Sequence, residues 1–443
     1  MSFETDKQTL DDLNILGKYK NNSIYSLFGG IATRGGERLL EEMFLHPLTD
    51  TGEINRRVAT FRYFKEHAFV FPGEAKACDL VEQYLGSASG KYWTVNYFRL
   101  LRLKGAEIIA HDRRYEAWRE QVTVTVAFFA ATRVFLGEVA AGMAGHPLEG
   151  RVKQGLELLE SPGAVRVLSC PTGEVGIGEI LLRDRYFCHT RLLAFRELLL
   201  LLHELDVCIV VGRIAREREF CFPVAREGDA LSISVKGLHH PALPGAISND
   251  MEITRTRNIF FLTGANMAGK STLMKSFGIA VYLAHMGFPV AARSMEFSVQ
   301  DGIYTSINVP DNINLGYSHF YAEVLRVKKV AEEVSKSKRL VVIFDELFKG
   351  TNVKDAYDAT LAVTAALAKR RLCSFLVSTH IIEVGEELEK RCDNVTFAYL
   401  PTVMRGNVPT YTYRLESGIT GDKHGMIIIN NERIVEIIRG QVD

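Results

Sequence analysis

The stretch NIFFLTGANMAGKST, residues 258–272, decides the fold of this chain. Its apolar run, residues 259–262, predicts a short buried strand. The pattern G-x-x-x-x-G-K-S then runs from Gly264 to Ser271, and a helical pattern continues to residue 286. Strand, glycine-rich loop and helix in this order are the context that a phosphate-binding loop requires. A chance glycine turn ahead of a helix is the alternative, and the GKS ending argues against it.

The residue types in this loop predict a chemistry. Glycines let the backbone turn so that successive N–H groups point at one phosphate, and the new helix adds its amides and dipole. We expect Lys270 to reach the β- and γ-phosphates of a nucleotide, and the Ser271 hydroxyl to hold Mg²⁺. The predicted nucleotide-binding residues are Gly264, Ala265, Asn266, Met267, Ala268, Gly269, Lys270, Ser271 and Thr272.

Two later strands end in polar residues. LVVIFDE, residues 340–346, has the continuous apolar run of a strand buried on both faces. Asp345 is expected to bind Mg²⁺ and Glu346 to polarise an attacking water. Two acids can also simply end a strand, and the upstream loop favours the functional interpretation. His380 closes the next strand, where it can sense the γ-phosphate, position the water or act as a plain polar cap.

Composition excludes several classes of protein. The 443 residues suggest two or three domains, and 47% hydrophobic and 24% charged residues are typical of a globular chain. A formal net charge of zero gives no global signature of nucleic-acid binding and leaves a local basic patch open. The seven cysteines are scattered without a CxxC, which predicts a reducing, cytoplasmic setting without a disulfide framework or zinc site. Charged residues interrupt the apolar stretch 192–212, which predicts a buried helix rather than a membrane span.

The chain divides into three parts by pattern. Residues 1–25 are polar and predict a loosely held leader, and residues 26–220 are mostly helical, although VTVTVAFF alone could pass for a strand and residues 161–180 predict a loop with a short strand. In residues 221–443, strands and helices alternate, which predicts an α/β domain with a mostly parallel sheet and an antiparallel edge hairpin around residues 405–407. The predicted strands are 231–235, 258–263, 340–344, 373–378, 394–400 and 409–415, and the predicted helices of this part are 271–286, 320–334, 354–370, 381–391 and 430–438.

Six segments together resemble the MutS family of DNA mismatch-repair ATPases. GANMAGKST (264–272) is similar to that family's GPNMGGKST loop, and FDELFKGT (344–351) to its DE-x-x-x-GT strand and loop. The other four are GYSHFYAE (316–323), similar to G-x-S-x-F-x-x-E; STH (378–380), similar to the switch histidine motif; LHHPAL (238–243), similar to an R-H-P stretch; and RGGERLLEEMFLHPL (34–48), similar to the start of the helical core. Their order and spacing agree over about residues 26–430.

The resemblance implies an α/β P-loop NTPase domain preceded by a helical core or lever domain. It implies Mg²⁺-dependent hydrolysis of ATP, and a homodimer formed head to tail through the ATPase domains. Ser318 would then lie against the nucleotide of the partner chain, Asn266 would contact the γ-phosphate region, and His380 would take part in catalysis. It also implies DNA and repair-type protein partners, and no membrane.

The chain departs from the family's pattern in several places. It begins about where the family's core domain begins, so we expect the mismatch-recognition and connector domains to be absent, and residues 26–220 look short for a full DNA clamp. Ala265 and Ala268 replace a Pro and a Gly, and Ala268 would be strained by roughly 1 kcal/mol if that position needs a positive φ. The segment PGAISN (244–249) offers no aromatic ring for adenine, which leaves base selectivity open.

Three functions compete at this point. The first is an ATP-driven switch on duplex or branched DNA without direct mismatch reading. Basic residues would contact phosphates in it, and a solvated helix face is the alternative for them: Arg99, Arg102, Lys104, Arg113 and Arg114. The second is a nucleotide-dependent module that grips a protein partner and has no DNA role. The third is a small-molecule kinase, in which Ser318 and the STH segment would have no function.

Overall fold

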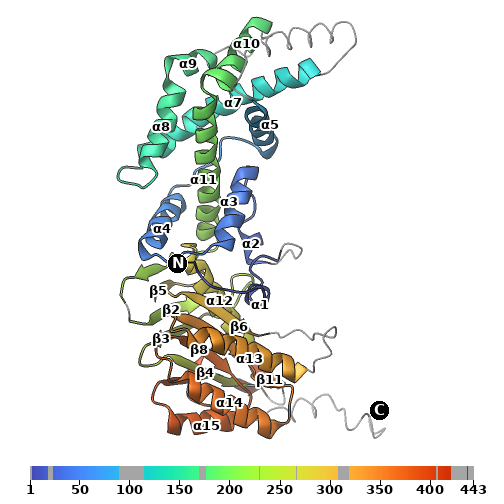
Figure 1. The fold of residues 1–443 in the computed structure, drawn as a ribbon, viewed down its shortest axis with the longest axis vertical. Coiled ribbons are helices and arrows are strands. Elements are labelled where there is room, and N and C mark those ends of the chain that lie inside the picture. Colours follow the sequence, from blue (N-terminus) through green and yellow to red (C-terminus); the bar gives the residue numbers. More distant parts are fainter. Residues whose placement is uncertain are drawn as a thin grey trace. The chain divides into compact units, whose positions relative to one another are not determined.

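A computed structural model describes residues 2–17, 23–88, 114–168, 176–228, 230–265, 267–307, 319–405, 408–420 and 437. The chain forms two compact units (Figure 1). The sheet unit comprises Met1–Leu27, Phe44–Val58 and Ala215–Asp443, and the helical unit comprises Phe28–Met43 and Ala59–Ile214. The first 27 residues and a short helical stretch therefore belong with the sheets, a division that the local patterns did not suggest.

The helical unit is built around two long helices, α7 (Arg114–Ala141) and α11 (Leu192–Glu217), of which α11 runs on into the sheet unit. Its aromatic core includes Phe129, Phe187 and Phe195, whose ring centroids lie 4.7 to 5.7 Å apart. The shorter elements are α3 (Arg34–Leu45), α4 (Thr51–Glu66), α5 (Ala75–Ser87), α8 (Glu149–Glu160), α9 (Pro162–Leu168), α10 (Ile177–Arg185) and the π-helical turn η1 (Tyr186–Thr190); α3 and α4 also run on into the sheet unit.

Local patterns predicted most of these helices. VTVTVAFF lies inside α7, as expected. The Glu53 amide donates to the Asp50 carboxylate (2.7 Å), which caps the start of α4. The predicted loop and strand over 161–180 is wrong, because α9 and α10 occupy much of that range. Pro162 indicated a loop in the sequence, but it is the first residue of α9, where a helix needs no N–H from it.

Among the described helices, α7 alone is long and apolar enough to cross a membrane by length and composition. Val122, Phe129 and Leu136 of this helix are fully buried inside the helical unit. Core helices of globular proteins pass the same test, so a single helix of this kind is weak evidence for a membrane span. The predicted buried helix over 192–212 is confirmed as part of α11.

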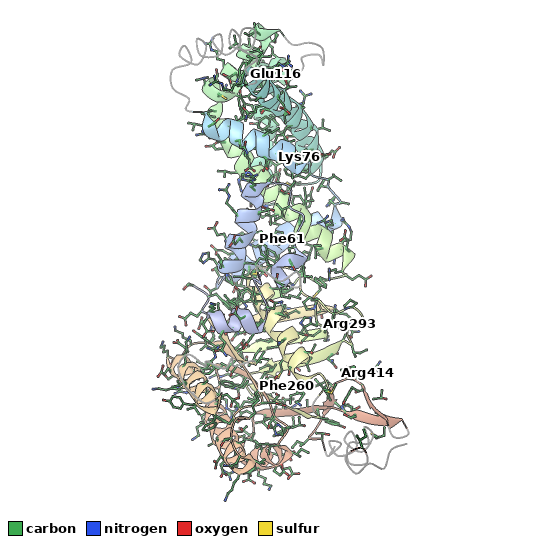
Figure 2. The ribbon with its side chains drawn as sticks, turned by 90° about the vertical axis from the view of Figure 1, so that its right-hand side faces the viewer. Phe61, Lys76, Glu116, Phe260, Arg293 and Arg414 are labelled. Carbon is green, nitrogen blue, oxygen red and sulfur yellow. The ribbon has the colours of Figure 1, made fainter. Side chains whose placement is uncertain are left out.

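The main sheet of the sheet unit has six strands in the order β12-β9-β4-β8-β7-β6. Every neighbouring pair is parallel except β12 and β9, so the expected mostly parallel sheet is confirmed. Buried side chains of these strands, such as Phe260, fill the unit's interior (Figure 2). The strands are β4 (Ile259–Gly264), β6 (Gly302–Ser306), β7 (Leu340–Asp345), β8 (Ser374–Ser378), β9 (Val395–Leu400) and β12 (Glu416–Ser417).

Helices connect these parallel strands: α12 (Lys270–His285), α13 (His319–Ser335), α14 (Val353–Leu367) and α15 (Ile382–Arg391). Their positions agree with the predicted helices to within a few residues. In the strand register, Ser378 of β8 lies opposite both Leu262 of β4 and Asp345 of β7. The carboxyl ends of these three strands therefore meet at one edge of the sheet, which is where parallel sheets place their ligands.

Two further sheets depart from the prediction. A four-stranded sheet contains β1 (Val224–Arg226), β5 (Ser294–Ser298), β2 (Ser232–Leu238) and β3 (Asn249–Thr254), in this order. The predicted hairpin exists as the antiparallel pair β10 (Thr402–Arg405) and β11 (Val408–Tyr411), but it forms its own sheet, and β12 is the antiparallel edge of the main one. The predicted helix over 430–438 lies outside the described residues except for Ile437.

The predicted loosely held leader is wrong for the described residues. Helix α1 (Lys7–Asp12) packs on the sheet unit, and Phe3, Leu13 and Ile15 are buried to 8, 1 and 0% exposure. The segment is polar on average, but these three apolar side chains are buried in the core. A second short helix, α2 (Ile24–Leu27), follows before the helical unit begins.

Candidate nucleotide-binding site

The glycine-rich loop joins β4 to α12 through a run of unusual backbone angles. Gly264 has a φ of +144° and Gly269 a φ of +98°, and Gly269 directly precedes the first residue of α12. A third left-handed position is Met267, with a φ of +72° and a side chain that is 75% exposed. Ala268 has no such angle and is buried, so the strain considered for it does not arise. Asn266 lies outside the described residues.

Lys270 is a buried cation that lacks a close anionic partner. Its side chain is 5% exposed, and its Nζ donates to the carbonyl oxygens of Gly264 (2.8 Å) and Ala265 (3.1 Å). The Glu346 carboxylate lies 3.8 Å away, beyond hydrogen-bond distance. Burial lowers the pKa of the Lys270 ammonium, and the Glu346 and Asp345 carboxylates act in the opposite direction. A buried ammonium that donates to two carbonyl oxygens and has its nearest carboxylate 3.8 Å away is suited to receive a further anionic ligand.

The two carboxylates follow β7 and are held by β8. The Ser378 hydroxyl donates to Oδ1 of Asp345, and the amide of Glu346 donates to the Ser378 carbonyl (3.1 Å) and hydroxyl (3.3 Å). Glu346 itself has a φ of +53°, and Phe348 a φ of +61°. Non-glycine residues rarely adopt this conformation, and such strained positions cluster at functional sites. The serine of STH thus holds the Asp345 carboxylate and the Glu346 backbone, a role that the sequence did not suggest.

His380 approaches Glu346 from the loop after β8. Its Nδ1 lies 3.8 Å from Glu346 Oε1, the same oxygen that lies 3.8 Å from Lys270 Nζ, and its side chain is 49% exposed. The structure therefore brings together Lys270, Asp345, Glu346 and His380, which are up to 110 residues apart in the chain. Their chemical roles stay predictions.

Lys270, Asp345 and Glu346 border a cavity of about 780 Å³, whereas His380 is not among its lining residues. This volume is in the usual range of small-molecule sites. Its floor comes from the glycine-rich loop and the start of α12, including Ser271 and Thr272, and its rim includes Asp345 and Glu346. A further wall comes from residues 238–240 and 243–247 and from Tyr413. The hydroxyl of Ser271 and the carboxylate of Asp345 are hard oxygen donors, which is the chemistry that Mg²⁺ requires.

Tyr413 is a site residue that sequence reasoning missed. It follows β11 with a φ of +54°, is 46% exposed, and lies against the loop: a Cβ atom placed on Gly269 would stand 3.0 Å from its ring. The Asn249 side chain holds this turn by donating to the Tyr413 carbonyl (3.0 Å) and accepting from the Leu415 amide (2.7 Å). The ring reaches the cavity from far along the chain, and only the aromatic run TYTY hinted at it.

The segment GYSHFYAE lies only partly in the described residues. Ser318 lies outside them, whereas the predicted helix over 320–334 is confirmed as α13. Glu323 of this helix is 5% exposed and accepts a hydrogen bond from the Gly350 amide (3.4 Å). The Phe320 ring packs edge-on against Phe348, with centroids 6.2 Å apart. Helix α13 therefore contacts the loop that carries Glu346.

Comparisons with known proteins point to one family. The family model of MutS domain V matches residues 260–439. The DNA mismatch repair protein MutS of Chlamydia muridarum is 32% identical over 232 residues, which cover 50% of this chain and 28% of that protein. Proteins with the same name from Chlorobaculum parvum (28% over 232 residues; 51% of this chain and 26% of theirs) and Lactococcus lactis subsp. cremoris (27% over 229 residues; 50% and 27%) match similarly. The chain spans little more than a quarter of the length of these curated relatives. Residues 260–439 of this chain are therefore similar to MutS domain V, and the comparisons together support a MutS-family protein.

Proposed function

We propose that this chain is a Mg²⁺-dependent ATPase that switches conformation with its nucleotide and acts on duplex or branched DNA. One observation carries the nucleotide part: the buried ammonium of Lys270 faces a 780 Å³ cavity whose rim holds Asp345 and Glu346. A phosphate chain bound there would give the Lys270 ammonium anionic acceptors in place of neutral carbonyl oxygens, so that both partners of each hydrogen bond carry a charge.

The described residues suit both the phosphates and the metal ion. Backbone amides at the start of α12 and the Lys270 ammonium would bind the phosphate oxygens, with Asn266 beside the γ-phosphate. Ser271 and Asp345 would hold Mg²⁺, whose charge would neutralise the charge on the phosphates, and Ser378 fixes the Asp345 carboxylate for this task. Tyr413 offers an exposed ring to the base, so adenine would lie between it and the wall of residues 238–240 and 243–247.

Hydrolysis then requires one proton transfer. Glu346 would accept a proton from the attacking water as the oxygen forms its bond to the γ-phosphorus and the bond to the β-phosphate oxygen breaks, giving ADP and phosphate. His380 stands 3.8 Å from Glu346 Oε1, from where it orients the carboxylate and senses the γ-phosphate. Lys270 and His380 both lie 3.8 Å from the same oxygen of Glu346. A bound γ-phosphate would therefore change the electrostatic environment of all three side chains.

The DNA part of the proposal rests on the relatives. Those that match are DNA mismatch repair proteins by name, and the family model that matches residues 260–439 is that of MutS domain V. The proposal therefore assigns nucleotide-driven switching, and not the reading of mismatches, to this chain. Dimerisation through the sheet units, with Ser318 against the partner's nucleotide, is part of it, as are repair-type protein partners and a cytoplasmic location. Of the basic residues proposed for DNA contact, Arg114 begins α7 and is exposed, and the other four lie outside the described residues.

A titration with DNA tests this proposal. The purified chain is mixed with perfect duplex, single-mismatch duplex and a four-way junction, with and without ATP and Mg²⁺, at two salt concentrations. We expect binding that weakens steeply with salt, because phosphate contacts release counterions, and that changes with ATP. Perfect and mismatched duplexes should bind equally. ATP hydrolysis without binding to any of the three would contradict the DNA role and would favour an ATPase that grips a protein partner.

A further inference from the structure

Residues 3–15, which we call the N-terminal strap, pair with the free edge of the main sheet. Strand β6 is the last strand in the sheet order, and Glu4 forms a parallel bridge to Gly302, the first residue of this strand. The Glu4 amide donates to Asp301 (2.8 Å), and the Ile303 amide donates back to Glu4 (2.9 Å). Gly302 permits this approach, because a Cβ atom at that position would stand 2.3 Å from the Glu4 carbonyl oxygen. The close backbone contact between Glu4 and β6 therefore requires a glycine at position 302.

Helix α1 of the strap holds the carboxyl end of β6. The Asp12 carboxylate accepts hydrogen bonds from the Thr305 hydroxyl (2.6 Å) and the Ile307 amide (3.0 Å), and the Thr9 hydroxyl accepts from the Thr305 amide (3.0 Å). Thr9 and Asp12 are buried, at 0 and 5% exposure. Ile307 lines the candidate nucleotide cavity. Asp12 therefore fixes a stretch of backbone that forms part of the cavity wall.

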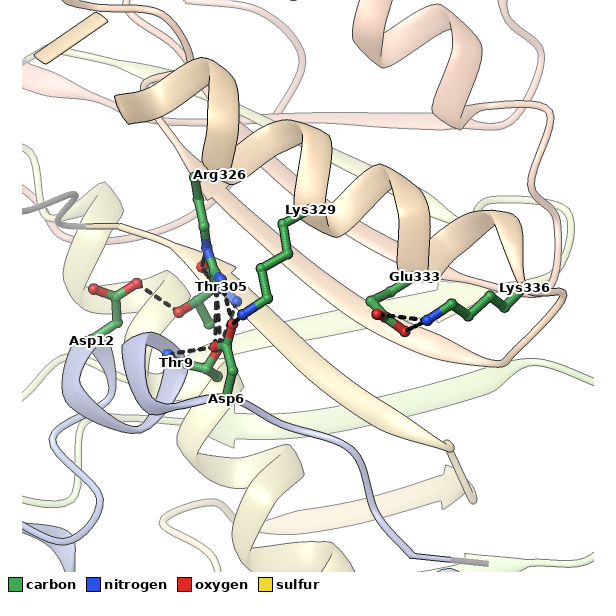
Figure 3. A network of polar contacts seen from close by, with 8 residues as sticks. All are labelled: Asp6, Thr9, Asp12, Thr305, Arg326, Lys329, Glu333 and Lys336. Carbon is green, nitrogen blue, oxygen red and sulfur yellow. Dashed lines mark hydrogen bonds and ion pairs between the residues drawn. The ribbon is translucent and has the colours of Figure 1, made fainter. Parts of the chain in front are cut away.

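The strap also holds α13 through ion pairs (Figure 3). The Arg326 guanidinium, 5% exposed, donates to both oxygens of the Asp6 carboxylate and to the Thr305 carbonyl, and Lys329 donates to Asp6 (2.7 Å). Burial alone would raise the pKa of Asp6, but the hydrogen bonds from Arg326 and Lys329 hold it well below its ordinary value. The same helix contacts the Glu346 loop through Glu323, as described above. Helix α13 thus connects Asp6, through Arg326, with the Glu346 loop, through Glu323.

A third set of contacts reaches α12, the helix that starts at Lys270. The Phe3 ring packs against His285 and Tyr282, with centroids 4.6 and 6.0 Å apart. Leu13 lies against Gly278, where an added Cβ would stand 2.8 Å from it. The strap therefore contacts the edge strand, the helix after the glycine-rich loop and the helix that braces the Glu346 loop. Each of these three elements leads into the candidate site.

We infer that the N-terminal strap is a positioning device for the nucleotide site, and that Asp12 is its central positioning residue. The inference rests on the proposed nucleotide-binding function. Asp12 acts through Ile307 and Thr305 and does not touch the nucleotide. Because binding energies are reciprocal, a nucleotide that requires this wall in place must in turn stabilise the docked strap. Couplings of this kind change affinity by about 5- to 150-fold.

Two pairs of variants separate positioning from simple stability. Asp12→Asn neutralises the carboxylate whose oxygen accepts both hydrogen bonds. Asp11→Asn makes the same change one residue away, on the exposed side of α1. Thr305→Val removes the buried hydroxyl at nearly constant shape, whereas Thr305→Ser keeps it. The dissociation constant of a fluorescent ATP analogue is measured for each, well below the unfolding temperature of every variant.

We expect Asp12→Asn and Thr305→Val to weaken nucleotide binding at least fivefold, and both control variants to stay within twofold of the unmodified chain. Glu333→Gln serves as a control on α13, because it breaks an ion pair with Lys336 that does not involve the strap (Figure 3). Unchanged affinity in Asp12→Asn and Thr305→Val, with binding abolished in Lys270→Ala, would overturn the strap inference and leave the proposed function intact. No nucleotide binding by the unmodified chain would overturn both.

Hydrogen exchange provides a test that needs no variant. Amides that report the docked strap are those of Ile303, Thr305 and Ile307, which donate to Glu4, Thr9 and Asp12. A nucleotide analogue at a hundred times its dissociation constant should slow exchange at all three, because it stabilises the docked state. Slower exchange around Lys270 without any change at these amides would overturn the coupling.

Discussion

Replacing Glu346 with Gln should separate nucleotide binding from hydrolysis. Gln has nearly the same shape, keeps the amide that donates to Ser378, and can adopt the φ of +53° at a similar cost, so the fold should persist. It cannot accept a proton from water. Loss of a positioned general base costs about 10²- to 10⁴-fold in rate, and we expect a fall of that size in kcat.

Nucleotide affinity should not fall together with kcat. The carboxylate lies 3.8 Å from Lys270 Nζ, at which distance two unit charges interact by on the order of 4 kcal/mol with an effective dielectric constant of 20, before solvation is counted. It attracts the same ammonium that the phosphates need, and it repels the phosphates. Removing its charge should therefore leave ATP binding unchanged or make it several times tighter.

Steady-state hydrolysis and equilibrium binding of a fluorescent ATP analogue measure the two effects in the same preparations. Glu383→Gln is the matched control, because it neutralises an exposed acid in the first turn of α15 just after His380. That variant should keep both constants within twofold. A kcat in Glu346→Gln within threefold of the original, or an ATP affinity lost together with activity, would refute the assigned role.

Two further predictions follow from individual side chains. Tyr413→Ala should weaken ATP binding about tenfold and Tyr413→Phe much less, because the ring and not the hydroxyl would face the base; equal effects, compared by analogue titration, would contradict an aromatic contact. Burial lowers the pKa of His285 to about 4, because the fully buried ring is removed from the water that would solvate its charged form. The unfolded chain takes up this proton near pH 6.5, so stability is present above that pH and should fall by about 2 kcal/mol between pH 8 and pH 5, as measured by urea unfolding. The slope should flatten in His285→Gln, and an unchanged slope there would assign the effect to other groups.

The core of the site could be predicted because its signals are local. The apolar run of β4, the glycines at 264 and 269 and the helical pattern of α12 are contiguous, and each specifies a backbone conformation by itself. Asp345, Glu346 and His380 could be placed beside this loop because parallel strands end at a common edge.

The remaining features depend on partners far away in the chain. Asp6 forms an ion pair with Arg326, 320 residues later. The polar composition of the first residues therefore predicted a loose segment where tertiary contacts order one. Tyr413 enters the cavity from the turn after β11, and no pattern around residue 244 indicates it. The four-stranded sheet combines β1 with β5, about 70 residues apart, and its pairing is set by burial rather than by local alternation.

The central claim is tested most directly by the stability that ATP confers. Unfolding of the unmodified chain and of Lys270→Ala is followed with and without ATP and Mg²⁺, at a nucleotide concentration a hundred times the dissociation constant of the unmodified chain. Lys236→Ala, which removes an exposed ammonium on β2, serves as the control. At a hundred times the dissociation constant, ATP bound at a single site stabilises the folded state by about 2.7 kcal/mol. We predict this gain in the unmodified chain and in Lys236→Ala, and its loss in Lys270→Ala. The same gain in Lys270→Ala would contradict the assignment of this loop as the phosphate-binding site.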